Sequence, residues 1–503
     1  MGAAPLWKIL SEEQAEQIHE RALHLLAQTG IVFQSDDVVR RFADAGADVD
    51  WGRQLVKLPP KLVQDLLSTV PRRFLLGGRS PAFDVEVSAE RTVCRPIVGC
   101  TYVIDGQTGA RREVTTAAAA AIARLLDALP TFAFSGAVAY PADEPPLTRD
   151  VYYLKLLLAN GQKHPIVSPY GAKNIEYMYR LGVVLAGGGE EHGRRPRFHV
   201  LTAPTSPLQY SATQTAMIVK AAELMIPNQV SSTPMTGATS PVTLAGQTLL
   251  LHPENLAGIA LTQLVRPGCP VYYAARPNAM DLRTGNSLWG AIEWGLTGAA
   301  CLQLARQAHL ICDCFGCVTD SKVMDEQAAI EKTMNATLVA LAGANVVSGG
   351  GFLETINTTS LEQLVIDDEI QGMLGRVSRG IAMDEERLAE ALIDRVGHGG
   401  NYLGEEHARR HYRQEHYLPK VLDRDLWDVW REKGGKDIVQ RARERAGDLL
   451  RAEAPDPLPE ETRRELRRIL EAARADIAVW RRRARANGRQ EERACNHRVY
   501  SQS

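Results

Sequence analysis

Residues 229–275 read QVSST PMTGATS PVTLAGQTLLLHPENLAGIALTQLV RPGC PVYYAA. A short run at Gln229–Thr233, with β-branched Val230 and Thr233, is predicted as a strand and leads into a turn rich in Pro, Gly and Thr, which is followed by a helical pattern at Pro241–Val265. A short apolar run, Pro270–Ala275, ends the stretch. A strand, a long helix and a second strand in this order are typical of a βα unit in a parallel sheet. The stretch therefore predicts an α/β fold.

The same alternation extends in both directions from this stretch. Eight strands are predicted, most of them largely apolar, as strands covered on both faces should be: Val93–Gly99, Phe134–Tyr140, Pro165–Tyr170, Phe198–Ala203, Gln229–Thr233, Pro270–Ala275, Leu310–Phe315 and Ala344–Gly349. Each is followed by a helical pattern: Thr115–Leu129, Thr148–Asn160, Lys173–Ala186, Tyr210–Met225, Pro241–Val265, Leu288–Gln307, Asp325–Leu341 and Leu361–Arg379. Eight such units over roughly 290 residues match a (β/α)8 TIM barrel. A doubly wound open sheet is the alternative that the pattern leaves open.

The flanking segments are predicted to extend the barrel with helices. Residues 1–92 are expected to form a mostly helical N-terminal extension with short strands near its end, and residues 93–383 the barrel. Residues 384–486 are predicted to form a helical C-terminal extension, and residues 487–503 a basic, disordered tail.

Composition excludes several classes of protein. The formal net charge of −2 argues against a dedicated nucleic-acid or membrane-surface protein. We find neither a signal-peptide core nor an apolar run of transmembrane length. The eight Cys lie mostly in apolar stretches of a long chain, which indicates reduced thiols in a reducing compartment. Together these features predict a cytoplasmic enzyme.

In a barrel of this kind the loops that follow the strands carry the chemistry. These loops are rich in Gly, Pro, Thr and Tyr, and the run Gly349, Gly350, Gly351 would let something large approach the backbone, although a tight turn alone also explains it. The sequence has no Walker A motif, no G-x-G-x-x-G after the first strand and no G-x-S-x-G elbow. Phosphate-binding and serine-nucleophile chemistry therefore have no support.

Two groups of residues could hold a metal ion. Cys312, Cys314 and Cys317 could bind zinc as thiolates, or they could be small buried side chains. His407 and His411 share a helix face, with His416 near, but that helix lies outside the barrel, so the pattern favours surface or docking histidines over a metal site.

Several stretches, taken in order, resemble the trimethylamine methyltransferase family: TPMTGATSPVTLAG at 233–246, LVRPG at 264–268, MDLRTG at 280–285, TDSK at 319–322, LAGAN at 341–345, EQLVID at 362–367 and GGNYLG at 399–404. The resemblance covers nearly the whole chain except the basic tail. It implies a (β/α)8 barrel that moves a methyl group from an amine to the cobalt of a separate corrinoid protein. The family archetype uses pyrrolysine, whereas this chain has only standard residues, so it resembles the branch that demethylates quaternary amines such as glycine betaine.

A quaternary nitrogen already carries the charge that makes an amine a leaving group, so the enzyme must mainly hold the cation and align it. Aromatic faces and a carboxylate suit that task. The aromatic candidates are Tyr102, Tyr140, Tyr170, Trp289 and Phe352, and the counter-charges expected to act in catalysis are Asp320 and Glu354. Arg276 or Arg283 could pair with a substrate carboxylate, and Gly349–Gly351 would give the corrinoid access. Each of these residues also has a purely structural interpretation, as packing or as one half of an ion pair.

The chain has no D-x-H-x-x-G cobalamin signature, so the resemblance implies that the corrinoid is carried by a partner protein and that no cofactor is tightly bound. Two other functions remain open from the sequence: a zinc-thiolate methyltransferase using the three cysteines, and a non-catalytic barrel that only binds a ligand. The long helical C-terminus offers a surface for a homo-oligomer, which barrel enzymes of this size often form.

Overall fold

In the computed structural model, which describes residues 7–452 and 457–486, eight parallel strands form one sheet in the order β6-β18-β17-β14-β13-β11-β10-β9. Their bounds are β6 (Val93–Pro96), β9 (Ser135–Gly136), β10 (Pro165–Val167), β11 (His199–Thr202), β13 (Asn228–Ser232), β14 (Val271–Ala275), β17 (Cys312–Phe315) and β18 (Val346–Gly350). Parallel bridges from Cys94 to Phe132 and from Cys100 to Ala139 join the two ends of this order. The sheet is thus a nearly closed barrel, and the predicted fold class is confirmed.

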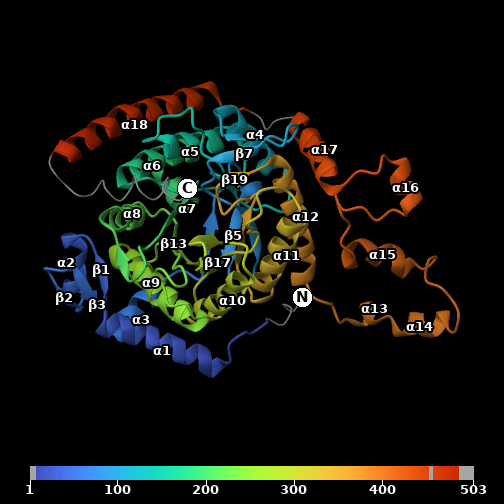
Figure 1. Cartoon of the computed structure of the whole chain (residues 1–503), viewed down its shortest axis with the longest axis horizontal. Coiled ribbons are helices and arrows are strands. Elements are labelled where there is room, and N and C mark those ends of the chain that lie inside the picture. The colour runs from blue at the N-terminus through green and yellow to red at the C-terminus, as the bar shows by residue number, and fades with distance from the viewer. Residues whose placement is uncertain (1–6, 453–456, 487–503) are drawn as a thin grey trace.

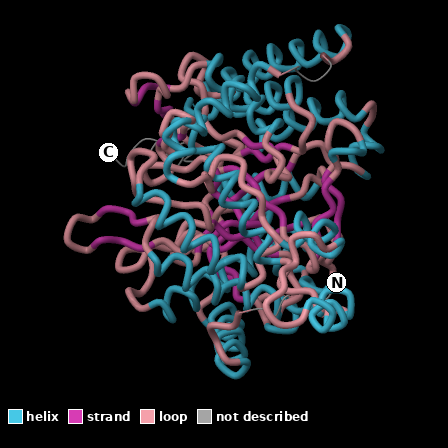
Figure 2. Tube along the Cα trace, turned by 90° about the vertical axis from the view of Figure 1, so that its right-hand side faces the viewer, coloured by secondary structure: helices cyan, strands magenta, loops and turns pink. Residues whose placement is uncertain are grey.

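Eight helices form the outer ring: α4 (Thr116–Ala128), α5 (Arg149–Asn160), α6 (Ala172–Ala186), α8 (Ala212–Glu223), α9 (Leu244–Val265), α10 (Ile292–Gln307), α11 (Glu326–Leu341) and α12 (Leu361–Ser378). Several begin where a hydroxyl or carboxylate accepts a backbone N–H of the first turn, as Thr115, Ser211 and Asp325 do. The ring runs counterclockwise from α4 to α12 in Figure 1, so with right-handed βα units the carboxyl ends of the strands face the viewer. Figure 2 shows the strands gathered inside this shell of helices.

The amino-terminal end of the barrel is covered by a hairpin of β4 (Arg73–Leu76) and β5 (Val85–Ser88), joined through a 3-10 helix at Pro81–Phe83. Apolar side chains of this hairpin pack against residues of the barrel strands, and the Phe74 ring meets Tyr272 edge-on at 5.0 Å. Because this end is covered, a ligand has access through the opposite end, the mouth.

The N-terminal segment holds α1 (Glu12–Gln28), α2 (Asp36–Asp44) and α3 (Pro60–Ser68). It also holds β1 (Ile31–Phe33), β2 (Asp48–Asp50) and β3 (Leu55–Lys57), which form a sheet with β12 (Gln209–Tyr210) from a barrel loop, in the order β12-β1-β3-β2. The patterning did not predict this small sheet, because runs of two or three residues are too short to show an alternation.

After α12 the chain forms α13 (Glu385–Leu388), α14 (Glu390–Val396), α15 (Glu406–Glu415), α16 (Trp427–Glu432), α17 (Ile438–Arg451) and α18 (Glu460–Ala486). α17 packs on α12 and α4, and α18 packs on α6 and α5, whereas Figure 1 shows α13 to α16 standing away from the barrel as an arm. The predicted basic tail lies outside the described residues. None of the helices described is long and apolar enough to cross a membrane.

The mouth carries two further strand groups. The chain after β6 and β18 forms the three-stranded sheet β19-β7-β8, made of β19 (Thr358–Thr359), β7 (Tyr102–Ile104) and β8 (Arg111–Glu113). The chain after β14 forms a hairpin of β15 (Ala279–Asp281) and β16 (Asn286–Leu288). A short helix, α7 (Gly189–Arg194), lies between α6 and β11.

Candidate active site

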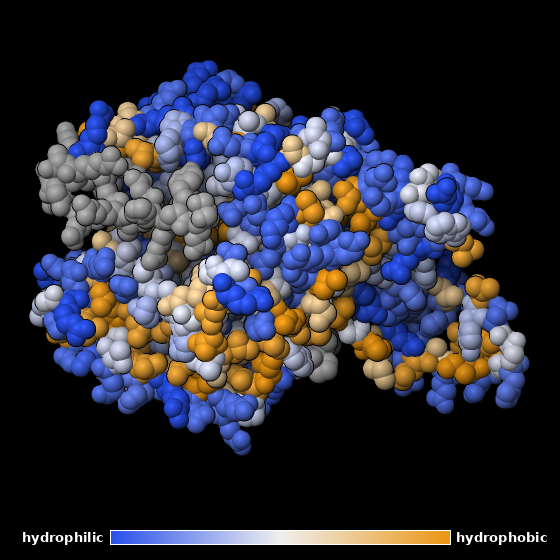
Figure 3. Space-filling model, in the orientation of Figure 1, coloured by the Kyte–Doolittle hydropathy of each residue, from blue (hydrophilic) through white to orange (hydrophobic). Residues whose placement is uncertain are grey.

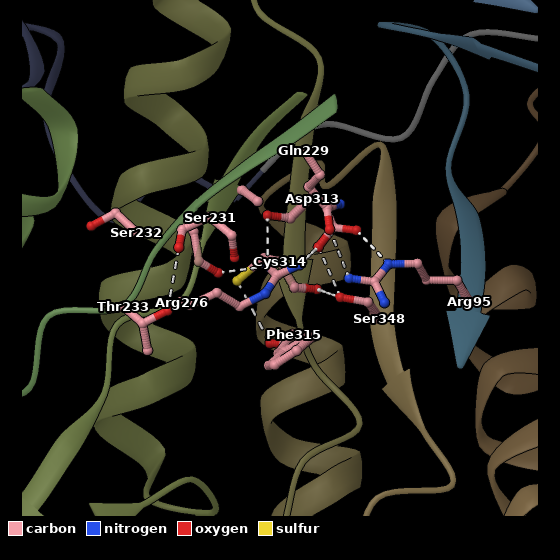
Figure 4. A network of polar contacts seen from close by, with 12 residues as sticks. Arg95, Gln229, Ser231, Ser232, Thr233, Arg276, Asp313, Cys314, Phe315 and Ser348 are labelled. Carbon is pink, nitrogen blue, oxygen red and sulfur yellow. Dashed lines mark hydrogen bonds and ion pairs between the residues drawn. The ribbon is translucent and has the colours of Figure 1, made fainter. Parts of the chain in front are cut away.

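A buried charge network crosses the barrel interior. Arg95 on β6 donates from Nε to Oδ2 of Asp313 on β17 at 2.8 Å, and Arg276, at the end of β14, donates to Oδ1 of the same carboxylate (Figure 4). Gln229 accepts from Arg95 at 3.1 Å, and the Ser348 hydroxyl donates to Asp313 at 2.9 Å. Arg95, Arg276 and Asp313 are 1%, 2% and 0% exposed.

The charges of this network do not cancel. Two guanidinium groups share one carboxylate, so the three side chains carry a net charge of +1. Burial acts to raise the pKa of Asp313, but Arg276 and Arg95 outweigh it and leave that pKa below its ordinary value. An uncompensated buried cation favours an anionic group nearby.

An aromatic cluster adjoins the network. Trp289 stacks on Trp294 with ring centroids 4.6 Å apart and lies 5.6 Å from both Phe315 and Phe352. Trp294, Phe315 and Phe352 are buried, whereas Trp289 is only partly covered. The guanidinium carbon of Arg276 lies 3.9 Å from the centroid of Phe315. The partly open aromatic face and the buried positive charge are therefore joined through one phenyl ring.

Asp320 holds Trp289 in place. Its Oδ1 accepts the backbone N–H of Trp289 at 2.8 Å and the Thr355 hydroxyl at 3.1 Å, and its Oδ2 accepts the N–H of Gly290 at 2.9 Å. Burial raises the pKa of Asp320, and these hydrogen bonds only partly offset the rise. The carboxylate joins the loops that follow β14, β17 and β18.

Glu354 is paired with a cation of its own chain. Nε of Arg111 donates to Glu354 at 2.8 Å, and the same guanidinium lies 3.4 Å above the ring of Tyr102. Glu354, Thr355 and Ile356 all have positive φ angles, of 50°, 52° and 74°. Such a run is costly for residues that carry a side chain, and strain of this kind concentrates at functional sites.

The tyrosines on the other side of the mouth surround a buried carboxyl. The Tyr140 and Tyr170 rings lie 5.8 Å apart, and Asp150 accepts the N–H of Tyr170 at 2.8 Å and the amide of Asn174 at 2.8 Å. Burial raises the pKa of Asp150 to about 6, although its hydrogen bonds act to lower it. The patterning missed Asp150 because an acidic residue in the first turn of a helix has an ordinary explanation.

Neighbouring side chains and backbone pack closely against the three glycines at 349–351. A Cβ on Gly350 would lie 2.3 Å from the ring of Phe132, and one on Gly351, whose φ is +84°, would lie 2.6 Å from Leu364. Gly349 has a φ of +107°, and a Cβ on it would lie 2.9 Å from the carbonyl oxygen of Cys317. The chain itself thus fills the space that side chains would take at this turn.

The side chains of the remaining predicted residues have partners other than the charged groups of the network. Arg283, whose side chain is 88% exposed, pairs with Asp281 on the projecting hairpin. The thiols of Cys312, Cys314 and Cys317 contact Asn345, the carbonyl of Phe315 and Gln371, three separate neighbours. Burial raises the pKa of Cys312 to about 11 and that of Cys317 to about 12. Within residues 7–452 and 457–486 no three His, Cys, Asp or Glu side chains are grouped so as to hold a metal ion, so the zinc interpretation finds no ligand set there.

These features define a class of protein: a (β/α)8 barrel with a buried cationic network and a partly exposed tryptophan at its mouth. Residues 1–478 match the family described as Trimethylamine methyltransferase (MTTB), and the chain belongs to this family. The resemblance seen in the sequence motifs is thereby confirmed.

Relatives match over nearly their full length. The chain is 33% identical over 471 residues to the trimethylamine methyltransferase MttB of Desulfitobacterium hafniense strain DCB-2, covering 94% of this chain and 95% of that protein. It is 34% identical over 475 residues to the trimethylamine methyltransferase MttB of Methanosarcina barkeri (92% and 95% covered). It is 31% identical over 459 residues to the glycine betaine methyltransferase of D. hafniense strain Y51 (91% and 95% covered). The crystal structure of the M. barkeri monomethylamine methyltransferase (MtmB) superposes with a TM-score of 0.52 at 10% identity over 94% of this chain and 88% of that one, which shows a shared fold.

Proposed function

We propose that this chain transfers a methyl group from a quaternary amine bearing a carboxylate to the cobalt of a corrinoid held by a separate protein. The observation that carries the proposal is the net positive charge of Arg95, Asp313 and Arg276 directly beside the aromatic cluster of Trp289. A betaine has a group for each: its ammonium suits an aromatic face, and its carboxylate suits the uncompensated guanidinium. Trimethylamine offers only the first.

The proposed methyl transfer needs no general acid or base. As the methyl group leaves, the nitrogen keeps the bonding electron pair and becomes a neutral tertiary amine, while cobalt(I) of the acceptor supplies the two electrons of the new bond. No proton moves, so the chain has to bind, align and exclude water. In our proposal Trp289 binds the cation, and Asp320 positions Trp289 by accepting the backbone N–H of that residue. Tyr140, Tyr170 and Phe352 shape the rest of the site. The Glu354–Arg111 pair and the glycines 349–351 keep the mouth backbone in place for the corrinoid.

The proposal is tested by mixing the purified protein anaerobically with cob(I)alamin and one of glycine betaine, carnitine, proline betaine or trimethylamine. Formation of methylcobalamin is followed by its visible absorption. We expect product with at least one betaine and none with trimethylamine. Product with trimethylamine alone would contradict the carboxylate part of the proposal, and no product with any amine would contradict the whole.

We also propose that the protein is a cytoplasmic homo-oligomer whose arm takes part in the contact. The arm exposes apolar side chains that its own barrel does not cover, including Leu403 at 93% and Leu426 at 81%. Light scattering coupled to gel filtration measures the mass, and Leu403→Glu with Leu426→Glu should reduce it.

A further inference from the structure

The barrel helix α11 turns polar side chains inward and apolar ones outward. Ile330 and Met334, four residues apart on one face, are 63% and 51% exposed, whereas Asn335 is 1% exposed and Glu331 is only partly covered. In Figure 3 apolar residues gather over the region that α9 to α11 occupy in Figure 1. A polar side chain turned into the protein must find its partners within the chain, so the contacts of Glu331 and Asn335 show what this inverted helix holds.

Asn335 bridges two backbone groups on either side of the start of α10. Its Nδ2 donates to the carbonyl of Gly290 at 3.1 Å, and its Oδ1 accepts the N–H of Gly295 at 3.0 Å. α10 has no side-chain cap of its own, since its N-cap residue is Ala291, so the Asn335 amide satisfies a donor of its first turn from the neighbouring helix. The approach is close: a Cβ on Gly295 would lie 2.7 Å from the Asn335 oxygen.

Glu331, one turn earlier on the same face of α11, holds the loop after β17. Its Oε2 accepts the backbone N–H of Asp320 at 2.8 Å and the hydroxyl of Thr319 at 2.5 Å. The Asp320 carboxylate in turn accepts the N–H groups of Trp289 and Gly290. Glu331 therefore fixes the backbone of the residue whose side chain fixes Trp289.

The two routes from α11 converge on one pair of rings. Through Asp320, Glu331 acts on the N–H side of Trp289, and Asn335 holds the carbonyl of the next residue. Asn335 also holds the first turn of α10, which carries Trp294, the ring on which Trp289 stacks at 4.6 Å. A ring that is already ordered loses little freedom when a ligand binds to its face.

We infer that Glu331 and Asn335 are positioning residues for the cation site at Trp289; this rests on the proposed function. Each acts through the backbone groups that it holds. Their loss has a defined kinetic signature, because the ammonium gives up its charge as the methyl group leaves. An aromatic face then stabilises the bound substrate more than the transition state, so a misplaced ring raises the KM for the amine without lowering kcat.

The kinetic test uses free cob(I)alamin and the betaine that gives the most methylcobalamin with the unmodified enzyme. We expect Asn335→Ala and Glu331→Ala each to raise the KM for that betaine about 2- to 10-fold, the cost of ordering one side chain again on binding, with kcat unchanged. Glu331→Ala guards against misfolding of the fully buried Asn335→Ala, because Glu331 is partly exposed. Glu331→Gln keeps an oxygen that accepts the Asp320 N–H and should keep the native KM.

Asn345→Ala is the matched control. Asn345 is 2% exposed and, like Asn335, both donates to a carbonyl, that of Ser88 at 3.0 Å, and accepts a backbone N–H, that of Cys312 at 3.0 Å. It lies at the covered end of the barrel, where β5 ends. We expect Asn345→Ala to lower the melting temperature while leaving the KM for the betaine at the native value.

A spectroscopic test needs no turnover. The near-ultraviolet circular dichroism of the native protein minus that of Trp289→Phe isolates the signal of the Trp289 ring on Trp294. We expect Asn335→Ala and Glu331→Ala to lose most of this signal, and Asn345→Ala and Glu331→Gln to keep it.

The native dichroism signal in both alanine variants would overturn the inference. So would a native KM in both of them when Trp289→Ala raises it, since the ring would then bind without their help. Failure of the proposed function looks different: the unmodified enzyme forms no methylcobalamin with any amine, or Trp289→Ala itself leaves the KM unchanged. Either result removes the cation site, and the inference falls with it even where the dichroism signal is lost.

Discussion

Replacing Asp313 by Asn removes the carboxylate that the two buried guanidinium groups of the barrel share. Arg95 and Arg276 would then lie 1% and 2% exposed, with a charge of +2 between them where the native network has +1. Removing one partner of a buried ion pair typically costs about 3–5 kcal/mol, because the remaining charge stays away from water. We expect Asp313→Asn to fall in that range.

The loss of unfolding free energy in Asp313→Asn should appear as a lower melting temperature. With about 2.1 cal/mol/K of unfolding entropy per residue, a cooperative unit of about 290 residues from β6 to α12 has roughly 0.6 kcal/mol/K, so the midpoint should fall by about 5–8 °C. Calorimetry measures it directly. Asp281→Asn, which removes the partner of the exposed Arg283, is the control and should leave the midpoint unchanged.

A second substitution separates charge from packing. If the loss comes from unbalanced charge, Arg95→Met added to Asp313→Asn should raise the midpoint again, because it returns the interior to +1 while methionine fills most of the arginine stem. If the loss comes only from disturbed packing, the double variant should melt lower than the single one. An unchanged midpoint in Asp313→Asn, or a further drop in the double variant, would refute the reasoning.

Three other predictions follow from the site. Trp289→Ala should raise the KM for the quaternary amine about 2- to 30-fold, since an aromatic face contributes about 0.5–2 kcal/mol to cation binding, and Trp289→Phe should retain most of the affinity; equal KM values for all three proteins would argue against a cation site here. Because the pKa of Asp150 is raised to about 6, the folded state favours its protonated form, so the stability it contributes is present below pH 4 and is lost as the pH rises through 6. An asparagine does not ionise, so Asp150→Asn does not lose this stability as the pH rises. The melting temperature of Asp150→Asn minus that of the native protein should therefore increase between pH 4 and pH 7. A difference that stays constant over this range would contradict the raised pKa of Asp150. Gly350→Ala should lower the melting temperature, because the added Cβ meets the Phe132 ring at 2.3 Å; calorimetry with an alanine at exposed Gly404, where nothing lies within 4 Å, provides the comparison.

The elements of the barrel could be predicted because each βα unit is a local pattern. The run at Gln229–Thr233 and the helix after it are set by short-range hydrophobic spacing, and the structure places β13 and α9 there. The extent of a strand is less well predicted: β9 has two residues, against seven in the predicted Phe134–Tyr140, because a tight turn from the Val138 N–H to the Gly136 carbonyl at 2.8 Å interrupts the ladder, which resumes at the bridge between Cys100 and Ala139.

The sequence by itself determined the eight βα units and their order, because these follow from spacing along the chain, and it predicted a site at the carboxyl ends of the strands. Only the tertiary structure decided which charges meet. Arg95 interrupts a largely apolar strand in the sequence, and its partner Asp313 lies 218 residues away. The two side chains meet because closure of the sheet points both of them into the barrel interior. The same closure brought the loops of Asp320, Trp289 and Thr355 together, so a carboxylate that the sequence offered as a free counter-charge has its oxygens taken by backbone and hydroxyl donors. Chemistry at the mouth thus depends on contacts between distant segments, and a one-dimensional pattern cannot show which of them are satisfied.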